Sequence, residues 1–297
     1  MQIRLISGEK VADISGEELE ELRDIRGLKT CLNQLHGFPP RFRQRLLHHG
    51  ESLEETAILD FSMDLDLVVL PFADLSGSPM DDLAIAASAG RLAEVERMLQ
   101  LPQDPDTAAS EGYTPLIVAT VHGHVEIVGL LLEAGADKDL ADHEGSTPLI
   151  EASFNGRVEI ARLLIGAGAN KDKAANEGYT PLIIANVHGH VEIVRLLLEA
   201  GADPNLADHE GNRPLTAASA EGPVENVRLL LEAGANKDAA DNDGRTPLIV
   251  ASVRGDVEIV RLLLEAGADK DVADTGGQTP LIAASAKGHA DIVRLLQ

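Results

Sequence analysis

A chain of 297 residues with 25 basic and 49 acidic side chains has a formal net charge of −24. This acidity argues against binding to nucleic acid or to an anionic membrane, because both attract clustered Lys and Arg. It favours a protein partner with a basic surface, the alternative being that the charge serves solubility alone. Cys31 is the only cysteine, so no intramolecular disulfide can form. The N-terminus lacks the apolar core of a signal peptide, and no run of about 18 apolar residues indicates a membrane span. We therefore expect a location in the cytoplasm or the nucleus.

Residues 1–79 contain no repeat. Residues 1–6 and 10–14 are rich in apolar positions and flank a glycine-containing turn, which predicts a β-hairpin. Ser15 and Glu18 then form the capping-box pattern, in which a serine and a glutamate three positions later satisfy the first N–H groups of a helix.

Apolar residues recur at helical spacing from Leu19 to Leu35 and predict a helix after that box. Gly37 can end the helix, and Pro39-Pro40 prevents its continuation, since proline has no N–H to donate. The apolar residues of segment 65–70 predict a late β-strand.

The order of these elements, together with four short motifs, resembles ubiquitin and ubiquitin-like domains over residues 1–72. The motifs are Met1-Gln2-Ile3, Gly37-Phe38-Pro39-Pro40, Arg45-Leu46-Leu47 with Gly50, and Leu65-Asp66-Leu67-Val68. The resemblance implies a β-grasp fold.

Departures from that family limit what the resemblance implies. The family ends in a free Gly-Gly, whereas segment 70–73 runs on here, which argues against conjugation as a modifier, and Glu51 replaces the principal chain-linking lysine. Leu47 and Val68 match two of the three apolar residues of the family's binding patch, while the third falls on a hairpin loop that is shortened to residues 7–9. Ubiquitin-pathway receptors are therefore candidate partners through a partial patch.

After a predicted linker at residues 73–79, one signature recurs with a constant period of 33 and without insertion. A constant period of this length is typical of a stacked solenoid rather than a globular enzyme. Residues 80–109 keep the helical pattern but lack the Thr-Pro-Leu motif, and they predict a degenerate first repeat. The six copies of the signature are Gly112-Tyr113-Thr114-Pro115-Leu116, Gly145-Ser146-Thr147-Pro148-Leu149, Gly178-Tyr179-Thr180-Pro181-Leu182, Gly211-Asn212-Arg213-Pro214-Leu215, Gly244-Arg245-Thr246-Pro247-Leu248 and Gly277-Gln278-Thr279-Pro280-Leu281.

Each repeat predicts two helices, as residues 178–208 illustrate. Pro181 suits the first turn of a helix, where no N–H is needed, and Gly189 tolerates the left-handed backbone of a helix end. A second helix runs from Val191 towards Gly201. Because one such pair cannot bury its own apolar face, stacking of neighbouring units must supply the core.

These units resemble the ankyrin repeat over residues 80–297, and the resemblance implies antiparallel helix pairs with projecting hairpin-like loops. Residues 110–297 then comprise six repeats, the last truncated at Gln297. The family's motif histidine is replaced throughout, by Ile117, Ile150, Ile183, Thr216, Ile249 and Ile282. The predicted fold is mainly α: an ankyrin-repeat solenoid of helix-turn-helix units with a small α+β, ubiquitin-like β-grasp domain at the N-terminus.

In ankyrin-like stacks the contact surface uses the loop tips and the exposed ends of the first helices. The copies diverge most at the matching positions here, which include most of the few aromatic residues of the repeats, and aromatic rings make good interface anchors. The residues expected to bind a partner are Glu111, Tyr113, Val121, His122, His143, Glu144, Ser146, Phe154, Asn155, Glu177, Tyr179, Val187, His188, His209, Glu210, Asn212, Glu221, Asp243, Arg245, Val253 and Arg254.

Other chemistry has weak support in the sequence. The pairs His122/His124 and His188/His190 suggest metal ligands, but they repeat with the period and no Cys cluster or carboxylate–His set accompanies them. No phosphate-binding glycine motif occurs in a strand–helix context, and nothing marks a nucleophile. We therefore expect no catalytic residues, no cofactor and no metal.

Three functional hypotheses remain. The leading one is a non-catalytic, monomeric scaffold that binds partner proteins through its loop tips and concave face. The second is an adaptor of the ubiquitin or proteasome pathway that acts through residues 1–72. The third is a regulatory fragment of a larger protein, suggested by the last repeat, which stops inside its second helix.

Overall fold

The computed structural model describes residues 2–5, 7, 10–14, 22, 24–36, 38–59, 63–70, 82–101 and 104–297. Within it the chain forms two compact units, Met1–Asp137 and Lys138–Gln297. The predicted capping box, the helix-ending Gly37 and the predicted linker at 73–79 lie outside the described residues. No helix in the described ranges combines the length and the apolar character that crossing a bilayer requires.

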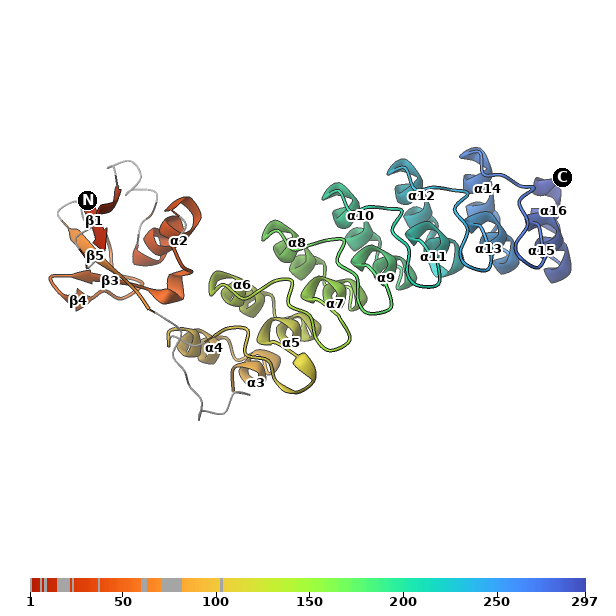
Figure 1. Ribbon diagram of the computed structural model, residues 1–297. Helices are drawn as coiled ribbons and strands as arrows, with labels where there is room; N and C mark the ends of the chain where they lie inside the picture. The colour runs from red at the N-terminus through yellow and green to blue at the C-terminus, as the bar shows by residue number, and fades with distance from the viewer. Residues whose placement is uncertain are drawn as a thin grey trace. The chain divides into compact units, whose positions relative to one another are not determined.

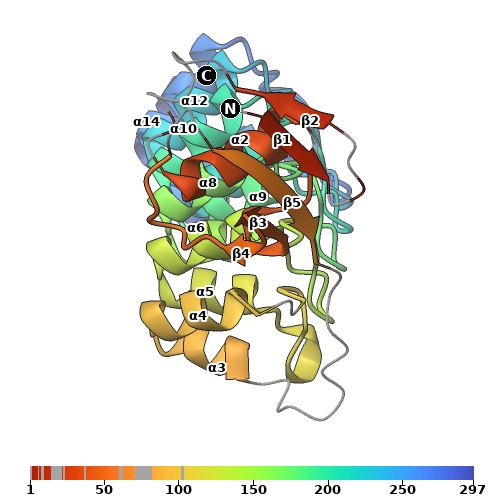
Figure 2. The same cartoon turned by 90° about the vertical axis from the view of Figure 1, so that its left-hand side faces the viewer.

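The first unit begins with a mixed β-sheet, in which the described residues form five strands (Figures 1 and 2). The order across the sheet is β2-β1-β5-β3-β4; β1 runs parallel to β5, and the other neighbours are antiparallel. The predicted hairpin and late strand are thus confirmed. The strands are β1 (Gln2–Leu5), β2 (Lys10–Asp13), β3 (Gln44–His48), β4 (Glu51–Ser52) and β5 (Asp64–Val69).

Helix α2 (Ile25–His36) covers one face of this sheet. Of the helix expected from Leu19 to Leu35, residues 19–21 and 23 lie outside the described residues, and α2 begins directly after Asp24, which forms an isolated antiparallel bridge with Ile58. Its carboxylate also accepts a hydrogen bond of 2.9 Å from the N–H of Gly27, as a capping residue does. The continuous apolar spacing therefore conceals a helix start at residue 25. The core between helix and sheet includes Ile3, Ile25, Leu28, Leu32, Leu46, Leu65 and Leu67.

Two helix pairs complete the first unit. They are α3 (Asp82–Ser88) with α4 (Leu92–Leu99), and α5 (Pro115–His122) with α6 (Val125–Glu133). α3 packs against α5, and α4 packs against α6, so first helices contact first helices and second helices contact second helices.

The second unit contains five further pairs, stacked in two rows (Figure 1). The first helices lie side by side in one row and the second helices in the other. Together with the sheet of the first unit, these pairs confirm the predicted fold class, mainly helical repeats with a small α+β part. The pairs are α7 (Pro148–Phe154) and α8 (Val158–Gly166), α9 (Pro181–Val187) and α10 (Val191–Glu199), α11 (Pro214–Glu221) and α12 (Val224–Glu232), α13 (Pro247–Arg254) and α14 (Val257–Glu265), and α15 (Pro280–Lys287) and α16 (Ala290–Leu296).

The Thr-Pro pair sets the start of the first helix in five of the six signature copies. The proline occupies the first turn, and the threonine hydroxyl accepts a hydrogen bond from the N–H three positions later, as in the 3.2 Å bond from Ile183 to Thr180. In the fourth copy Arg213 replaces the threonine and makes no such cap.

The fourth copy departs from the others in its core as well. The isoleucines that replace the motif histidine are buried in four copies, whereas the fourth has Thr216, whose buried hydroxyl has no hydrogen-bond partner among the described residues. Asn226 is 0% exposed, and neither its amide oxygen nor its amide nitrogen finds a partner there. The helix pair α11–α12 is thus the least well satisfied part of the second unit.

Candidate partner-binding surface

None of the residues expected to bind a partner is buried. Those of the first unit lie at the loop before α5 and at the end of that helix. Those of the second unit lie at the loop tips and at the ends of α7, α9, α11 and α13.

Most loop tips of the second unit are shaped by an aspartate that sequence reasoning did not single out. The carboxylate of Asp142 accepts hydrogen bonds of 2.9 Å from the N–H groups of Glu144 and Ser146. An aspartate that closes its own loop fixes the backbone on which the variable side chains stand. Ala175 takes this position in the following tip, and three later tips are closed in the same way by Asp208, Asp241 and Asp274.

Neighbouring tips are joined by backbone hydrogen bonds. The N–H of Asn176 donates to the carbonyl of Glu144 at 3.1 Å, and the N–H of His209 donates to the carbonyl of Glu177 at 3.0 Å. The N–H groups of Asn242 and Thr275 continue the pattern with bonds of 2.9 Å, each to the tip before its own. We call this series the tip ladder; it makes the tips of the second unit one continuous edge.

The four residues whose carbonyls accept these bonds all carry exposed carboxylates. They occupy the same position in successive repeats, so a carboxylate recurs at four of the five tips that the ladder joins; the fifth tip has Gly276, and Asp243 pairs with Arg245 at 2.7 Å. We call them the acidic row: Glu144, Glu177, Glu210 and Asp243. A fixed row of like charges favours a partner with basic groups at a matching spacing.

An aromatic and imidazole cluster lies at the ends of α7 and α9. The ring of Phe154 is 49% exposed, with its centroid 4.4 Å from that of His188. Burial lowers the pKa of His188, and the neighbouring His190 lowers it further, so His188 is neutral at neutral pH. The structure thus brings together two predicted site residues that belong to successive repeats.

The second histidine of the two His-Gly-His segments, and His289 at the same repeat position, contact the preceding repeat. Nε2 of His124 lies 3.0 Å from the carbonyl oxygen of Ser88, one repeat earlier, and His190 and His289 make the equivalent contacts with Phe154 and Val253. These contacts, which link one repeat to the next, explain the histidine found at this position in three of the six signature copies. No group of three or more His, Cys, Asp or Glu within the described ranges is arranged to hold a metal ion.

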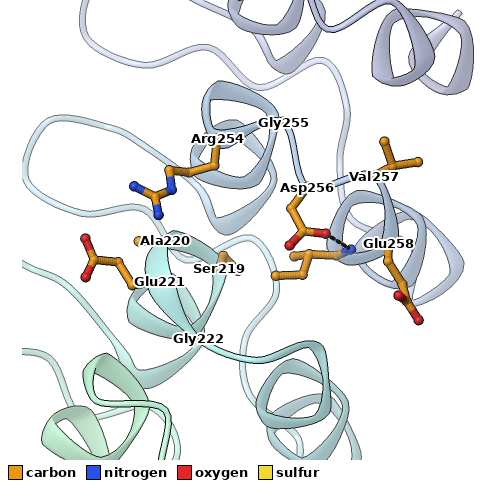
Figure 3. A pocket seen from close by; sticks show the side chains of 10 residues that line it. Ser219, Ala220, Glu221, Gly222, Arg254, Gly255, Asp256, Val257 and Glu258 are labelled. Carbon is orange, nitrogen blue, oxygen red and sulfur yellow. Dashed lines mark hydrogen bonds between the residues drawn. The ribbon is translucent and has the colours of Figure 1, made fainter.

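A groove of about 510 Å³ lies at one of the three signature copies in which another residue replaces that histidine; the other two have Arg157 and Pro223. Asp256 occupies the position, and its carboxylate accepts a hydrogen bond of 3.1 Å from the N–H of Ile259 as the cap of α14 (Figure 3). No imidazole therefore fills the space beside Gly222. Glu221 and Arg254, both predicted site residues, line one side of the groove, whereas Asp256 and Glu258 lie on the other (Figure 3).

A second series of aspartates links the turns that follow the second helices. Asp106 accepts the N–H of Asp137 with both carboxylate oxygens, at 2.9 and 3.0 Å, and later repeats use an acceptor at the same position. In one repeat that acceptor is Asn205, whose amide oxygen accepts the N–H of Asn236 at 2.7 Å. Burial raises the pKa of Asp106 to about 6, and the nearby Asp104 and Asp137 contribute to the rise.

Replacement of Asp106 by asparagine should therefore stabilise the protein at pH 7 by about 1 kcal/mol, after allowance for the partial exposure of the group. The folded state holds this proton more tightly than the unfolded state, so stability falls as the pH rises from about 4 to about 6. The gain should disappear near pH 3, where both states are protonated. Urea unfolding of the wild type and of Asp106→Asn at pH 7 and pH 3 tests this prediction. Asp172→Asn, at the same repeat position, measures the effect of replacing a carboxylate by an amide there. An equal gain in stability at both pH values would contradict the prediction.

The comparison with known proteins agrees with this geometry. A family model described as ankyrin repeats (3 copies) matches residues 83–175, 165–241 and 234–297. No curated protein matches the sequence.

Proposed function

The chain belongs to the ankyrin-repeat family, a protein–protein interaction module, and on that premise we propose that it is a non-catalytic scaffold whose loop tips bind a partner protein with a basic surface. The observation that carries this proposal is the acidic row, which stands on the hydrogen-bonded tip ladder of the second unit. Because the backbone of each tip is already fixed, little conformational entropy is lost when a partner binds.

The proposal assigns the predicted site residues to this surface in two roles. The acidic row would attract and orient a basic partner, and the exposed ring of Phe154, supported by His188, would supply an apolar anchor. Burial raises the pKa of Tyr179, and Asp208, Glu177 and Glu210 raise it further, so its hydroxyl remains a hydrogen-bond donor beside the row.

The proposed organisation follows from the same premise. Residues 1–72 form a head of ubiquitin-like type, residues 73–79 a linker, residues 80–109 a degenerate N-terminal repeat, and residues 110–297 six further repeats. The protein works as a monomer in the cytoplasm or the nucleus, without cofactor or catalysis.

Neutralisation of the acidic row tests the proposal. Affinity capture from native lysate with the full chain should recover partners that are lost from the variant Glu144→Gln, Glu177→Gln, Glu210→Gln and Asp243→Asn. The matched control neutralises four carboxylates of the second helices, Glu159, Glu192, Glu225 and Glu258, and should keep those partners. If both variants retain the same proteins, or both lose them, the tips are not the binding surface.

A second candidate function rests on the head. Leu47 and Val68 are both half-buried and stand on neighbouring antiparallel strands, where Arg45 pairs with Val68 and Leu47 pairs with Asp66. Since alternate residues of a strand point to opposite faces, both side chains lie on the face away from α2, where a receptor of the ubiquitin pathway could contact them. NMR titration with ubiquitin receptors should shift the signals of residues 45–50 and 63–70; unchanged signals would remove the adaptor role while leaving the scaffold role intact.

A further inference from the structure

A cluster of opposite charges lies between α2 and the second helices of the first unit. Arg41, in the short 3-10 turn Arg41–Arg43, has a side chain that is 1% exposed; its guanidinium pairs with Glu55 of the head and, at 2.6 Å, with Glu133 of α6. Arg26 of α2 pairs with Glu96 of α4 at 2.5 Å. The pairs Arg41–Glu133 and Arg26–Glu96 each join the head to a repeat.

The head brings three basic groups to a single carboxylate of its own. Glu55 contacts Lys29 at 3.2 Å and Arg26 at 3.5 Å, in addition to Arg41. Burial lowers the pKa of Lys29, so its charge is costly without neighbouring carboxylates. One carboxylate does not balance three cations, and the repeats supply the other two, Glu96 and Glu133.

The repeat sequence changes at this place. The position that is Glu96 in α4 is Gly129 in α6, but in every later second helix it is arginine: Arg162, Arg195, Arg228, Arg261 and Arg294. In the second unit Arg162 and Arg195 instead lie within 4 Å of a glutamate of the following repeat, Glu192 and Glu225 respectively. The two second helices that meet the basic side chains of this cluster are those from which the arginine is missing.

The close packing of the head against the turn after α6 agrees with the charge pattern. Gly135, in the turn after α6, has a φ of +87°, and a Cβ at this position would collide with Cγ of Pro40 in the head. Gly234 occupies the same repeat position three copies later with a φ of +83°, and a Cβ there would meet nothing within 4 Å. Of these two glycines, the one in the first unit has the head against it.

From these observations we propose that α4 and α6 form a docking surface for the chain's own head, held closed by an ionic clasp of Arg26–Glu96 and Arg41–Glu133. The clasp is opened by high ionic strength or by charge reversal, because the pairs involve groups such as Glu133 that are about half exposed and therefore screened by salt. Docking through α2 leaves the opposite sheet face, with Leu47 and Val68, uncovered. The clasp is independent of what the loop tips bind.

Charge reversal in the full chain tests the proposal. The variant Glu96→Arg with Glu133→Arg should raise the ratio of open to closed molecules about tenfold or more, as loss of partly buried ion pairs does. The expected signs are a larger radius of gyration in small-angle scattering and shifted amide signals in both α2 and α4. The wild type should show the same changes only as the salt concentration approaches about 1 M.

Two matched controls decide the origin of any effect. The double variant Glu199→Arg with Glu232→Arg reverses the charge at the repeat position of Glu133 in two later repeats. It should leave the amide signals of the head and the radius of gyration unchanged. Gly135→Ala should open the clasp by steric wedging without altering charge, whereas Gly234→Ala should not.

The swap Arg26→Glu with Glu96→Arg should restore closure relative to Glu96→Arg alone. If the charge-reversed variant keeps the wild-type dimensions and signals at low salt, or if the controls behave like it, the clasp does not exist.

Discussion

Replacement of Asn226 by isoleucine should raise the free energy of unfolding by about 3 kcal/mol. The side chain is fully buried in α12, and both polar atoms of its amide lack a hydrogen-bond partner among the described residues. An unsatisfied buried amide costs about 1–3 kcal/mol, and an apolar side chain of similar size adds the gain of burial. The site already has the right shape, because the same position is isoleucine in the other five copies: Ile127, Ile160, Ile193, Ile259 and Ile292.

Urea unfolding followed by far-UV circular dichroism measures this gain. The reciprocal variant Ile193→Asn, one repeat earlier, should lose a comparable free energy, since it places the same amide in an equivalent apolar site. Hydrogen exchange should also slow in α11 and α12 of the Asn226→Ile variant, because the least satisfied pair opens first. An unchanged midpoint for Asn226→Ile, together with a large loss for Ile193→Asn, would mean that the native amide is satisfied by ordered water.

Local signals predicted the repeats well. The constant period, the Thr-Pro pair and the helix-ending glycines act close to where they stand in the chain, and the structure places helix starts at those prolines. The hairpin and the late strand were predictable for the same reason. The start of α2 was not, because it depends on the bridge between Asp24 and Ile58, a contact that apolar spacing does not encode.

The sequence predicted which residues of the candidate partner-binding surface are exposed, but not how residues of different repeats contact one another. Exposure of the loop tips follows from the repeat pattern, but the tip ladder joins backbone groups of successive repeats, such as Glu144 and Asn176. The contact of Phe154 with His188 and the groove beside Asp256 likewise arise between repeats. A systematic comparison of repeat positions could have found two of these features, the acidic row and the loss of histidine at Asp256, since both appear when the copies are aligned at the period.

The ladder makes a prediction about Gly178. Its backbone has a φ of +87°, and a Cβ there would lie 2.9 Å from Cα of Asp208 and from the backbone nitrogen of His209, which belong to the next tip. Gly178→Ala should therefore cost about 3 kcal/mol: about 1 for the left-handed backbone and about 2 for separating the tips.

Gly277 provides the comparison, because it holds the same repeat position with a φ of +75°, and a Cβ there would meet no atom within 4 Å. Gly277→Ala should lose only the backbone contribution of about 1 kcal/mol. Urea unfolding of both variants isolates the difference, and amide exchange at His209 should rise only in Gly178→Ala, since that N–H donates to Glu177 across the ladder. Equal costs in the two variants would show that the tips move independently, and the acidic row would then have no rigid support on which to present its charges to a partner.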